Sequence, residues 1–338
     1  MLIKHLKIRR AKIDEKNKIT KFISKSFYRK NHILVKNSKL FKWQYINNYL
    51  SCSIALFKSK IVGLQFYIPL DQFDTNLKIN KEFFNSLWLT KKTNIIFLGA
   101  KIFDFTIKSL KPKLIIAMGL PSSLINFHLK KKFTIKKMQH SFILSPFIKN
   151  NVLKIDKKIV KNSKRIKIVK IISRSELNKL NVKQLFKFQY PIKSNTYLVN
   201  RFILHPIYKY YLYHINFNKN KCICVFRIVK LKRKKIIRIV EFIGSNNSFK
   251  ILNNFFIFIL KKYNADYLDF YSFGIPKKIL KISGLYIKDD FKNLIIPDHF
   301  EPFENKNIDI VIGYLSRYKN NSKIRLFKAD SDTDRPNL

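Results

Sequence analysis

Between residues 92 and 133, short apolar runs alternate with helical spacing, and a glycine lies where the first helix is expected to begin. An unbroken apolar run predicts a strand covered on both faces, whereas apolar residues three and four apart predict a helix. A glycine turn that opens a helix presents backbone N–H groups, which can hold a phosphate. The predicted elements are a strand at 95–98, a turn at 99–101, a helix at 102–110, a strand at 114–118 and a helix at 124–131.

The residues before this segment predict a small antiparallel sheet with helices. Two apolar runs separated by Lys58-Ser59-Lys60 indicate a hairpin, and the stretch that follows Asp14-Glu15 has the spacing of a helix. The predicted strands are 6–11, 53–58, 61–69, 82–90 and 133–144, and the predicted helix is 14–27.

The second half repeats this order of elements, without any short-period repeat. We therefore predict two copies of one α/β unit, at 1–150 and 175–338, joined by a basic linker at 151–174. Within the second copy we expect helices at 197–203, 249–263 and 275–282, and strands at 208–215, 222–230, 235–243 and 265–271; residues 166–172 are a further candidate strand.

The net charge of +49, from 69 lysines and arginines against 20 acids, is the strongest compositional signal. It creates a positive field that favours phosphorylated cofactors, nucleotide sugars, anionic lipid or nucleic acid. Mutational bias in an AT-rich genome is the alternative explanation. The sequence shows no signal peptide and no apolar run of about 18 residues. We expect a cytoplasmic protein whose basic surface could rest on the inner membrane face.

The three cysteines predict a reducing compartment, not a disulfide framework. Cys222 and Cys224 are two residues apart in an apolar run, so both side chains face the same side of a predicted strand. No further ligands at zinc-binding spacing accompany them. We interpret them as core residues and predict no metal site.

Residues 96–101 and 127–133 resemble the core of the GNAT acyltransferase superfamily, whose pattern before the third helix is Arg/Gln-x-x-Gly-x-Gly/Ala. Gly99 matches the central glycine, while Ile96 and Lys101 depart from the pattern. The resemblance implies an α/β (α+β) fold of two tandem GNAT-like domains, each a mixed, mostly antiparallel sheet flanked by helices. It further implies that acetyl-CoA or another acyl-CoA binds at Leu98, Gly99, Ala100 and Lys101.

The resemblance also points to His128. Phe127-His128-Leu129-Lys130-Lys131-Lys132-Phe133 is similar to a Phe-Tyr-Glu-Lys-Leu-Gly-Phe segment whose tyrosine protonates the departing CoA thiolate. His128 stands at the tyrosine position, and histidine can act as a general acid near neutral pH. The alternative is a solvated histidine on a basic helix.

Acids of the first half are candidates for the remaining roles. Glu82 begins the strand before the glycine turn and is our candidate general base, although water could relay the proton instead. Asp71 and Asp74 lie in the preceding loop and could border a substrate. Each could equally be a solvated surface acid.

In the second half, Arg201, Asp269 and Tyr271 are candidate ligands for sugar hydroxyls, because Asp269 and Tyr271 share one face of a predicted strand. Glu241 lies on another predicted strand that could be nearby. The alternative is that these groups form a buried ion-paired network with Arg201.

The chain ends in Asp330-Ser331-Asp332-Thr333-Asp334, an acidic run in a very basic protein. It lacks the glycine and the distal glutamate of a calcium loop. A strap pinned onto the basic surface is the better interpretation. This ending also resembles that of GNAT-like proteins from bacterial surface-polysaccharide gene sets.

The sequence therefore predicts an acyl-CoA-dependent N-acyltransferase, with a small-molecule or lipid-linked amino sugar as acceptor. The alternatives are a non-catalytic GNAT-like scaffold and a basic nucleic-acid-binding protein. Lysines interspersed with aromatics, as in Tyr208-Lys209-Tyr210-Tyr211, could stack bases. No RNP, KH or helix-turn-helix pattern accompanies them, so we do not favour a nucleic-acid partner.

Overall fold

A computed structural model describes residues 5–26, 32–148, 166–180, 182–231, 234–297 and 305–334. The chain divides into two compact units, which are described separately below. The first unit contains Met1–Ile135, Ile312–Lys319 and Arg335–Leu338, and the second contains Lys136–Val311 and Asn320–Asp334.

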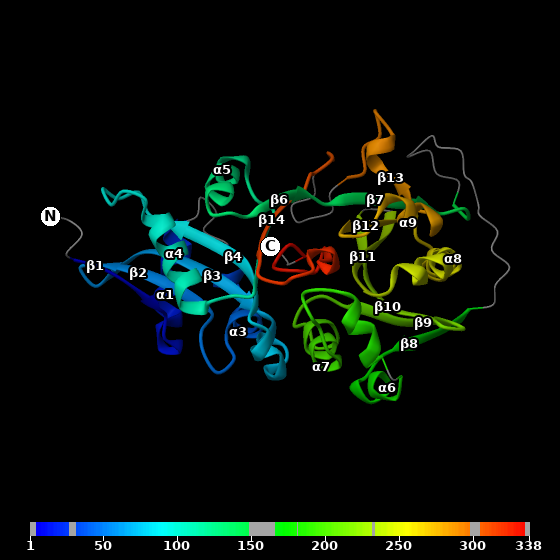
Figure 1. The fold of residues 1–338 in the computed structure, drawn as a ribbon, viewed down its shortest axis with the longest axis horizontal. Coiled ribbons are helices and arrows are strands. Elements are labelled where there is room, and N and C mark those ends of the chain that lie inside the picture. Colours follow the sequence, from blue (N-terminus) through cyan, green and yellow to red (C-terminus); the bar gives the residue numbers. More distant parts are fainter. Residues whose placement is uncertain are drawn as a thin grey trace. The chain divides into compact units, whose positions relative to one another are not determined.

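The first unit is built on a seven-stranded sheet (Figure 1). From β1 to β14 in the sheet order, neighbouring strands pair antiparallel except β4 and β5, which are parallel, so the sheet is mixed and mostly antiparallel as predicted. In spatial order they are β1 (Leu6–Arg10), β2 (Cys52–Phe57), β3 (Lys60–Pro69), β4 (Glu82–Thr90), β5 (Leu114–Met118), β14 (Val311–Ser316) and β6 (Thr134–Lys137). The helices are α1 (Lys16–Ser26), α2 (Ile33–Lys36), α3 (Ser38–Tyr45), α4 (Leu98–Leu110) and α5 (Ser122–Lys130).

Alternation along β3 explains why helices cover both faces of this sheet. Phe66 packs against the rings of Phe41 and Tyr45 of α3, with centroids 5.6 and 4.3 Å away. The neighbouring Tyr67 points to the other face and packs in one core cluster with Phe103 of α4. Helix α4 is thus fixed to the sheet by an apolar face, as its spacing predicts.

The strand predicted at residues 95–98 is wrong. A loop follows β4 instead, and α4 begins at Leu98, four residues earlier than expected. Ile95 is buried, but Ile96 and Phe97 are 72% and 78% exposed, and Phe97 has a φ of 56°. The apolar run resembles a strand in sequence, yet only its first and last residues, Ile95 and Leu98, join the core.

The single strand predicted at residues 133–144 is also wrong, because these residues form two strands in different sheets. β6 belongs to the first sheet and β7 (Gln139–Leu144) to the second, so the two units separate after Ile135. The structure does not describe residues 149–165. The predicted boundary at residue 150 and most of the predicted linker therefore lie outside the described residues. The end of that linker is the strand β8 (Lys167–Ile171), as the sequence allowed.

The second unit repeats the plan with an eight-stranded sheet, in which only β11 and β12 pair in parallel. Its strands are β13 (Tyr286–Ile287), β7, β12 (Tyr267–Phe273), β11 (Lys234–Gly244), β10 (Asn220–Leu231), β9 (Tyr210–Phe217) and β8, and β15 (Leu326–Phe327) pairs with β12. Its helices are α6 (Arg174–Lys179), α7 (Asn195–Leu198) continued by a π-helix (Val199–Ile203), α8 (Leu252–Tyr263) and α9 (Lys277–Ile282).

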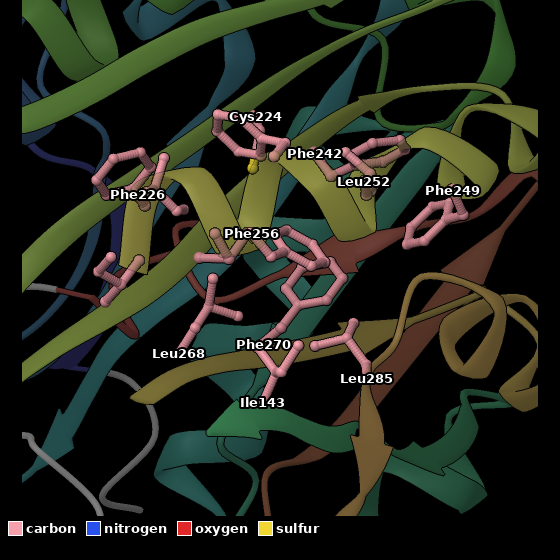
Figure 2. Packing of buried hydrophobic residues seen from close by; sticks show 14 of the residues in the cluster. Ile143, Cys224, Phe226, Phe242, Phe249, Leu252, Phe256, Leu268, Phe270 and Leu285 are labelled. Carbon is pink, nitrogen blue, oxygen red and sulfur yellow. The ribbon is translucent and has the colours of Figure 1, made fainter. Parts of the chain in front are cut away.

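One apolar cluster holds the second unit together, and Figure 2 shows the side chains of α8 packed against those of the sheet. Phe256 of α8 and Phe270 of β12 are both buried in it. Cys222 and Cys224 belong to the same cluster and are free thiols, which confirms their interpretation as core residues on one face of a strand. Within the described ranges, no helix has the length and apolarity needed to cross a bilayer.

Candidate functional site

The first turn of α4 supplies backbone N–H groups that have no acceptor within the helix. The first N–H with a helical acceptor is that of Lys101, which donates to the Phe97 carbonyl at 3.0 Å. The preceding N–H groups are those of Leu98, Gly99 and Ala100. Three of the four predicted cofactor-binding residues therefore present N–H groups at a helix start, whereas the backbone of Lys101 is already engaged.

A cavity of about 350 Å³ opens beside this turn. We call it the α4 pocket; it is lined by Trp88 and Thr90 of β4, Phe97, Gly99 and Ala100 at the start of α4, and Leu124 and Phe127 of α5. Its volume is within the range of small-molecule sites. The glycine turn and the helix predicted at 124–131 thus line one cavity, together with β4 and not with the strand predicted at 114–118.

The cavity lies where two parallel strands part. β4 pairs with β5 only from Glu82 to Asn85, although β4 continues to Thr90. At this point β4 has a bulge. Trp88 pairs with Gln65 and Asn85 with Tyr67, so β4 advances by three residues where β3 advances by two. A bulge bends its strand and interrupts the ladder. The final part of β4 therefore turns toward β3 and leaves an opening on the side of β5.

Gly99 is needed here because of a close approach. A Cβ at this position would lie 3.1 Å from Cζ2 of the Trp88 indole, tighter than most real contacts. The indole also stacks on Phe103 at 5.6 Å, and its Nε1 is buried without a described hydrogen-bond partner. Sequence reasoning missed Trp88 and Phe127, and the only available signal was an aromatic residue near the end of the strand before the glycine.

His128 lies on α5 next to the pocket-lining Phe127, but its own side chain is buried. Its Nδ1 donates to the Leu124 carbonyl at 2.9 Å, and the rings of Phe103, Phe127 and Phe133 surround it at 5.0–5.6 Å. Burial lowers the pKa of His128 below its ordinary value, although the hydrogen bond to Leu124 raises it. The surrounding rings favour a neutral side chain in the aromatic core.

Glu82 lies at the other end of β4. It is six residues from Trp88, about 20 Å along an extended strand, and its Oε1 accepts a hydrogen bond from Tyr318 at 3.0 Å. The structure therefore does not bring Glu82 to the α4 pocket.

Asp71 and Asp74 are buried in the short helices after β3, not solvated. Asp71 accepts from the Tyr49 hydroxyl at 3.1 Å, and burial raises the pKa of its carboxyl, while this hydrogen bond lowers it. Asp74 caps its helix by accepting from the Asn76 N–H at 3.1 Å. Neither acid lines the α4 pocket.

The second unit contains the equivalent opening, and the end of the chain fills it. β11 pairs with β12 only from Ile236 to Ile239, and a bulge follows at once in β11. Here β15 pairs with β12, and the Ala329 N–H donates to the Val240 carbonyl at 2.9 Å. The C-terminal segment thus bonds to both parting strands.

Buried ion pairs hold this segment, which is interior and not the surface strap predicted. Lys193 pairs with both Glu241 and Asp330, and Arg227 Nε donates to Asp334 Oδ1 at 2.8 Å. The side chains of Lys193, Glu241 and both aspartates have no exposed surface. The acidic ending therefore serves as buried counter-charge.

The three predicted sugar ligands are also buried. Arg201 donates to the Ala329 carbonyl at 2.8 Å, and Tyr271 donates to the Ile308 carbonyl at 3.2 Å. Asp269 binds Arg238 at 2.8 Å, so its partner is not Arg201. Burial alone would raise the pKa of Asp269, but the charge of Arg238 and contact with His140 lower it well below its ordinary value. Asp269 is thus in a buried ion pair, as the alternative interpretation held, but with Arg238 in place of Arg201.

No family model and no curated protein matches the chain. Solved structures do match. A conserved protein of Enterococcus faecalis described as a candidate N-acyltransferase is 11% identical, with a TM-score of 0.54 over 91% of this chain and 71% of its own. A GCN5-related N-acetyltransferase from Anabaena variabilis is 10% identical, with a TM-score of 0.52 over 93% and 73%. A candidate acetyltransferase from Pyrococcus horikoshii is 12% identical, with a TM-score of 0.50 over 98% and 97%.

At this level of identity the likeness concerns the fold. The neighbours are described as acetyltransferases or N-acyltransferases, and what this chain shares with them is the fold. The predicted fold class is confirmed: two mixed sheets with flanking helices, each with one parallel pair that parts beside a bulge.

Proposed function

We propose that the first unit binds acyl-CoA at the α4 pocket and transfers the acyl group to an amine. The observation that carries the proposal is the coincidence of helix-start N–H groups, at Gly99 and Ala100, with a cavity between parting strands. Helix N-termini bind anions through such groups and the helix dipole. The diphosphate of acyl-CoA is the corresponding ligand.

We infer that acyl transfer takes place at the opening beside β4. Alternate residues of a strand direct their N–H and C=O groups to opposite sides, so part of β4 beyond Asn85 faces the side that β5 has left. An N–H there would stabilise the oxyanion as the amine attacks the thioester carbonyl. The new C–N bond forms, the C–S bond breaks, and thiolate leaves as the amine proton passes to water.

We do not assign removal of the amine proton to Glu82, and we do not assign protonation of the thiolate to His128. Glu82 is far along β4, and His128 is enclosed by aromatic rings. The acceptor is proposed to be the amine of an amino sugar, free or lipid-linked, because a basic surface favours phosphorylated carriers.

Titration of acetyl-CoA into the full chain tests binding, and thiol release with amino sugars tests transfer. Gly99→Val adds a branched side chain against the Trp88 ring, and we expect acetyl-CoA affinity to fall at least tenfold, about 1.4 kcal/mol. Ser109→Val places the same branched side chain at an exposed position near the other end of α4 and should bind as wild type. Absence of saturable binding at millimolar acetyl-CoA would refute the proposal, and binding without transfer to any amine would favour the scaffold alternative.

A further inference from the structure

A second cavity, of about 550 Å³, lies in the first unit at the carboxyl end of α4. We call it the basic pocket; its lining consists of one tyrosine and five cations, namely Lys81, Lys111, Lys113, Arg317, Tyr318 and Lys319. It is separate from the α4 pocket, because α4 has 13 residues and a helix rises 1.5 Å per residue, about 20 Å in all.

The register of the sheet explains why the cations converge. Glu82 pairs with Leu114, and Leu114 pairs with Ser316, so the adjoining residues Lys81, Lys113 and Arg317 come from the same edge of three neighbouring strands. Hydrogen bonds continue the row: the Lys113 N–H donates to the Lys81 carbonyl at 2.9 Å, and the Arg317 N–H donates to the Lys113 carbonyl at 2.7 Å. Neighbouring strands are about 4.8 Å apart.

Like charges on adjacent strands destabilise a sheet unless counter-charges compensate them. No acidic side chain of the described residues forms an ion pair with any of the five cations. The dipole of α4 favours a cation at its carboxyl end, but that effect fades within the last turn and concerns Lys111. A bound anion would relieve the repulsion among the five cations that line this cavity.

The remaining wall gives the pocket a fixed shape. Tyr318 is anchored by its hydrogen bond to the buried Glu82, so its ring is held beside the cations. The lysine stems add apolar surface below their charged ends. Arg317 can bind a phosphate through two parallel N–H bonds, and lysines bind phosphate as point charges.

We propose that the basic pocket binds a ligand that carries a diphosphate group. Five cations exceed what a single carboxylate or phosphate needs, and the cavity has room for an organic portion beyond the diphosphate. The diphosphate could belong to a nucleoside diphosphate or to a lipid headgroup. The site is independent of acyl transfer, because it lies at the opposite end of α4.

Calorimetric titration with inorganic pyrophosphate tests the proposal on the full chain. The variant Lys111→Gln, Lys113→Gln, Lys319→Gln removes three exposed cations, and we expect at least tenfold weaker binding. The matched control, Lys36→Gln, Lys39→Gln, Lys42→Gln, removes three exposed cations from α2 and α3 and should bind within twofold of wild type. Gly99→Val should leave a pyrophosphate site in place, which separates this proposal from that of the α4 pocket.

Three outcomes would overturn the proposal. They are unchanged pyrophosphate affinity in the pocket variant, an equal loss in the control, and no saturable binding at millimolar pyrophosphate. Uridine diphosphate and vesicles that carry a lipid diphosphate distinguish the two sources of the ligand, because only one should compete with pyrophosphate. Pocket-dependent binding to phosphatidylglycerol vesicles or duplex DNA, without pyrophosphate binding, would assign the surface to a polyanion instead.

Discussion

Glu241→Gln should stabilise the protein more at alkaline than at acidic pH. Lys193 is the single ammonium between two carboxylates, those of Glu241 and Asp330, and none of the three side chains has exposed surface. A buried charge without full compensation is costly. Glutamine has the shape of the protonated acid and removes one negative charge from this group.

The magnitude follows from linkage. Burial raises the pKa of Glu241 to about 7 from an ordinary 4.5, the repulsion of Asp330 adds to this, and Lys193 acts against it. A raised carboxyl pKa means that the folded state takes up the proton more readily than the unfolded chain, so this stabilisation is lost as the pH rises through 7. As the pH falls from 7 to 5.5, protonation of Glu241 increases the free energy of unfolding of the wild type by about 2 kcal/mol, at 1.36 kcal/mol per pH unit.

Native-state hydrogen exchange of β11 amides, in increasing urea, measures the free energy of unfolding of the second unit. The advantage of Glu241→Gln over wild type should be larger at pH 8 than at pH 5.5 by about 2 kcal/mol. Buried histidines cancel in this comparison, because both proteins contain them. Asp309→Asn, which changes an exposed acid in the same unit, is the control. An equal advantage at both pH values, or a larger one at pH 5.5, would refute the reasoning.

Further predictions concern the partly buried Trp88 and the buried His128 and Asp334. Trp88→Phe should change stability by less than about 1 kcal/mol in urea unfolding, because the lost apolar surface is offset by removal of a buried, unpartnered N–H. His128→Phe should retain kcat within threefold; a hundredfold loss in a folded variant would instead identify His128 as the acid. Asp334→Asn should cost about 3–5 kcal/mol in the second unit, because Arg227 then stays buried without its carboxylate, and a loss below 1 kcal/mol would contradict this.

Local pattern was sufficient for most elements. β4 and β5 have the predicted bounds, because β4 follows turn signals and β5 is a continuous apolar run. The strand predicted at 95–98 failed because Phe97 takes a left-handed conformation that composition does not reveal. β14 was missed because its partner β5 is nearly 200 residues away, and no local signal specifies such a pairing.

The candidate site could be predicted in part. A glycine before helical spacing indicates a helix start nearby, and the structure places the start of α4 and a cavity beside Gly99. Trp88 could not be assigned, because the bulge that turns its strand depends on pairing with β3. For Asp269 and Arg201 the sequence left sugar ligands and buried ion-pair partners both open, because it does not show which partners burial brings to them.

The contact between the Gly99 N–H and the CoA diphosphate is the central claim, and glycine-selective ¹⁵N labelling tests it directly. The chain has seven glycines, so the amide spectrum contains at most seven signals, and Gly99→Ala identifies that of Gly99 by its loss. On titration with acetyl-CoA, the Gly99 signal should show the largest shift, while Gly244, Gly274 and Gly284 of the second unit stay unchanged. Saturable acetyl-CoA binding with an unmoved Gly99 signal would contradict the account.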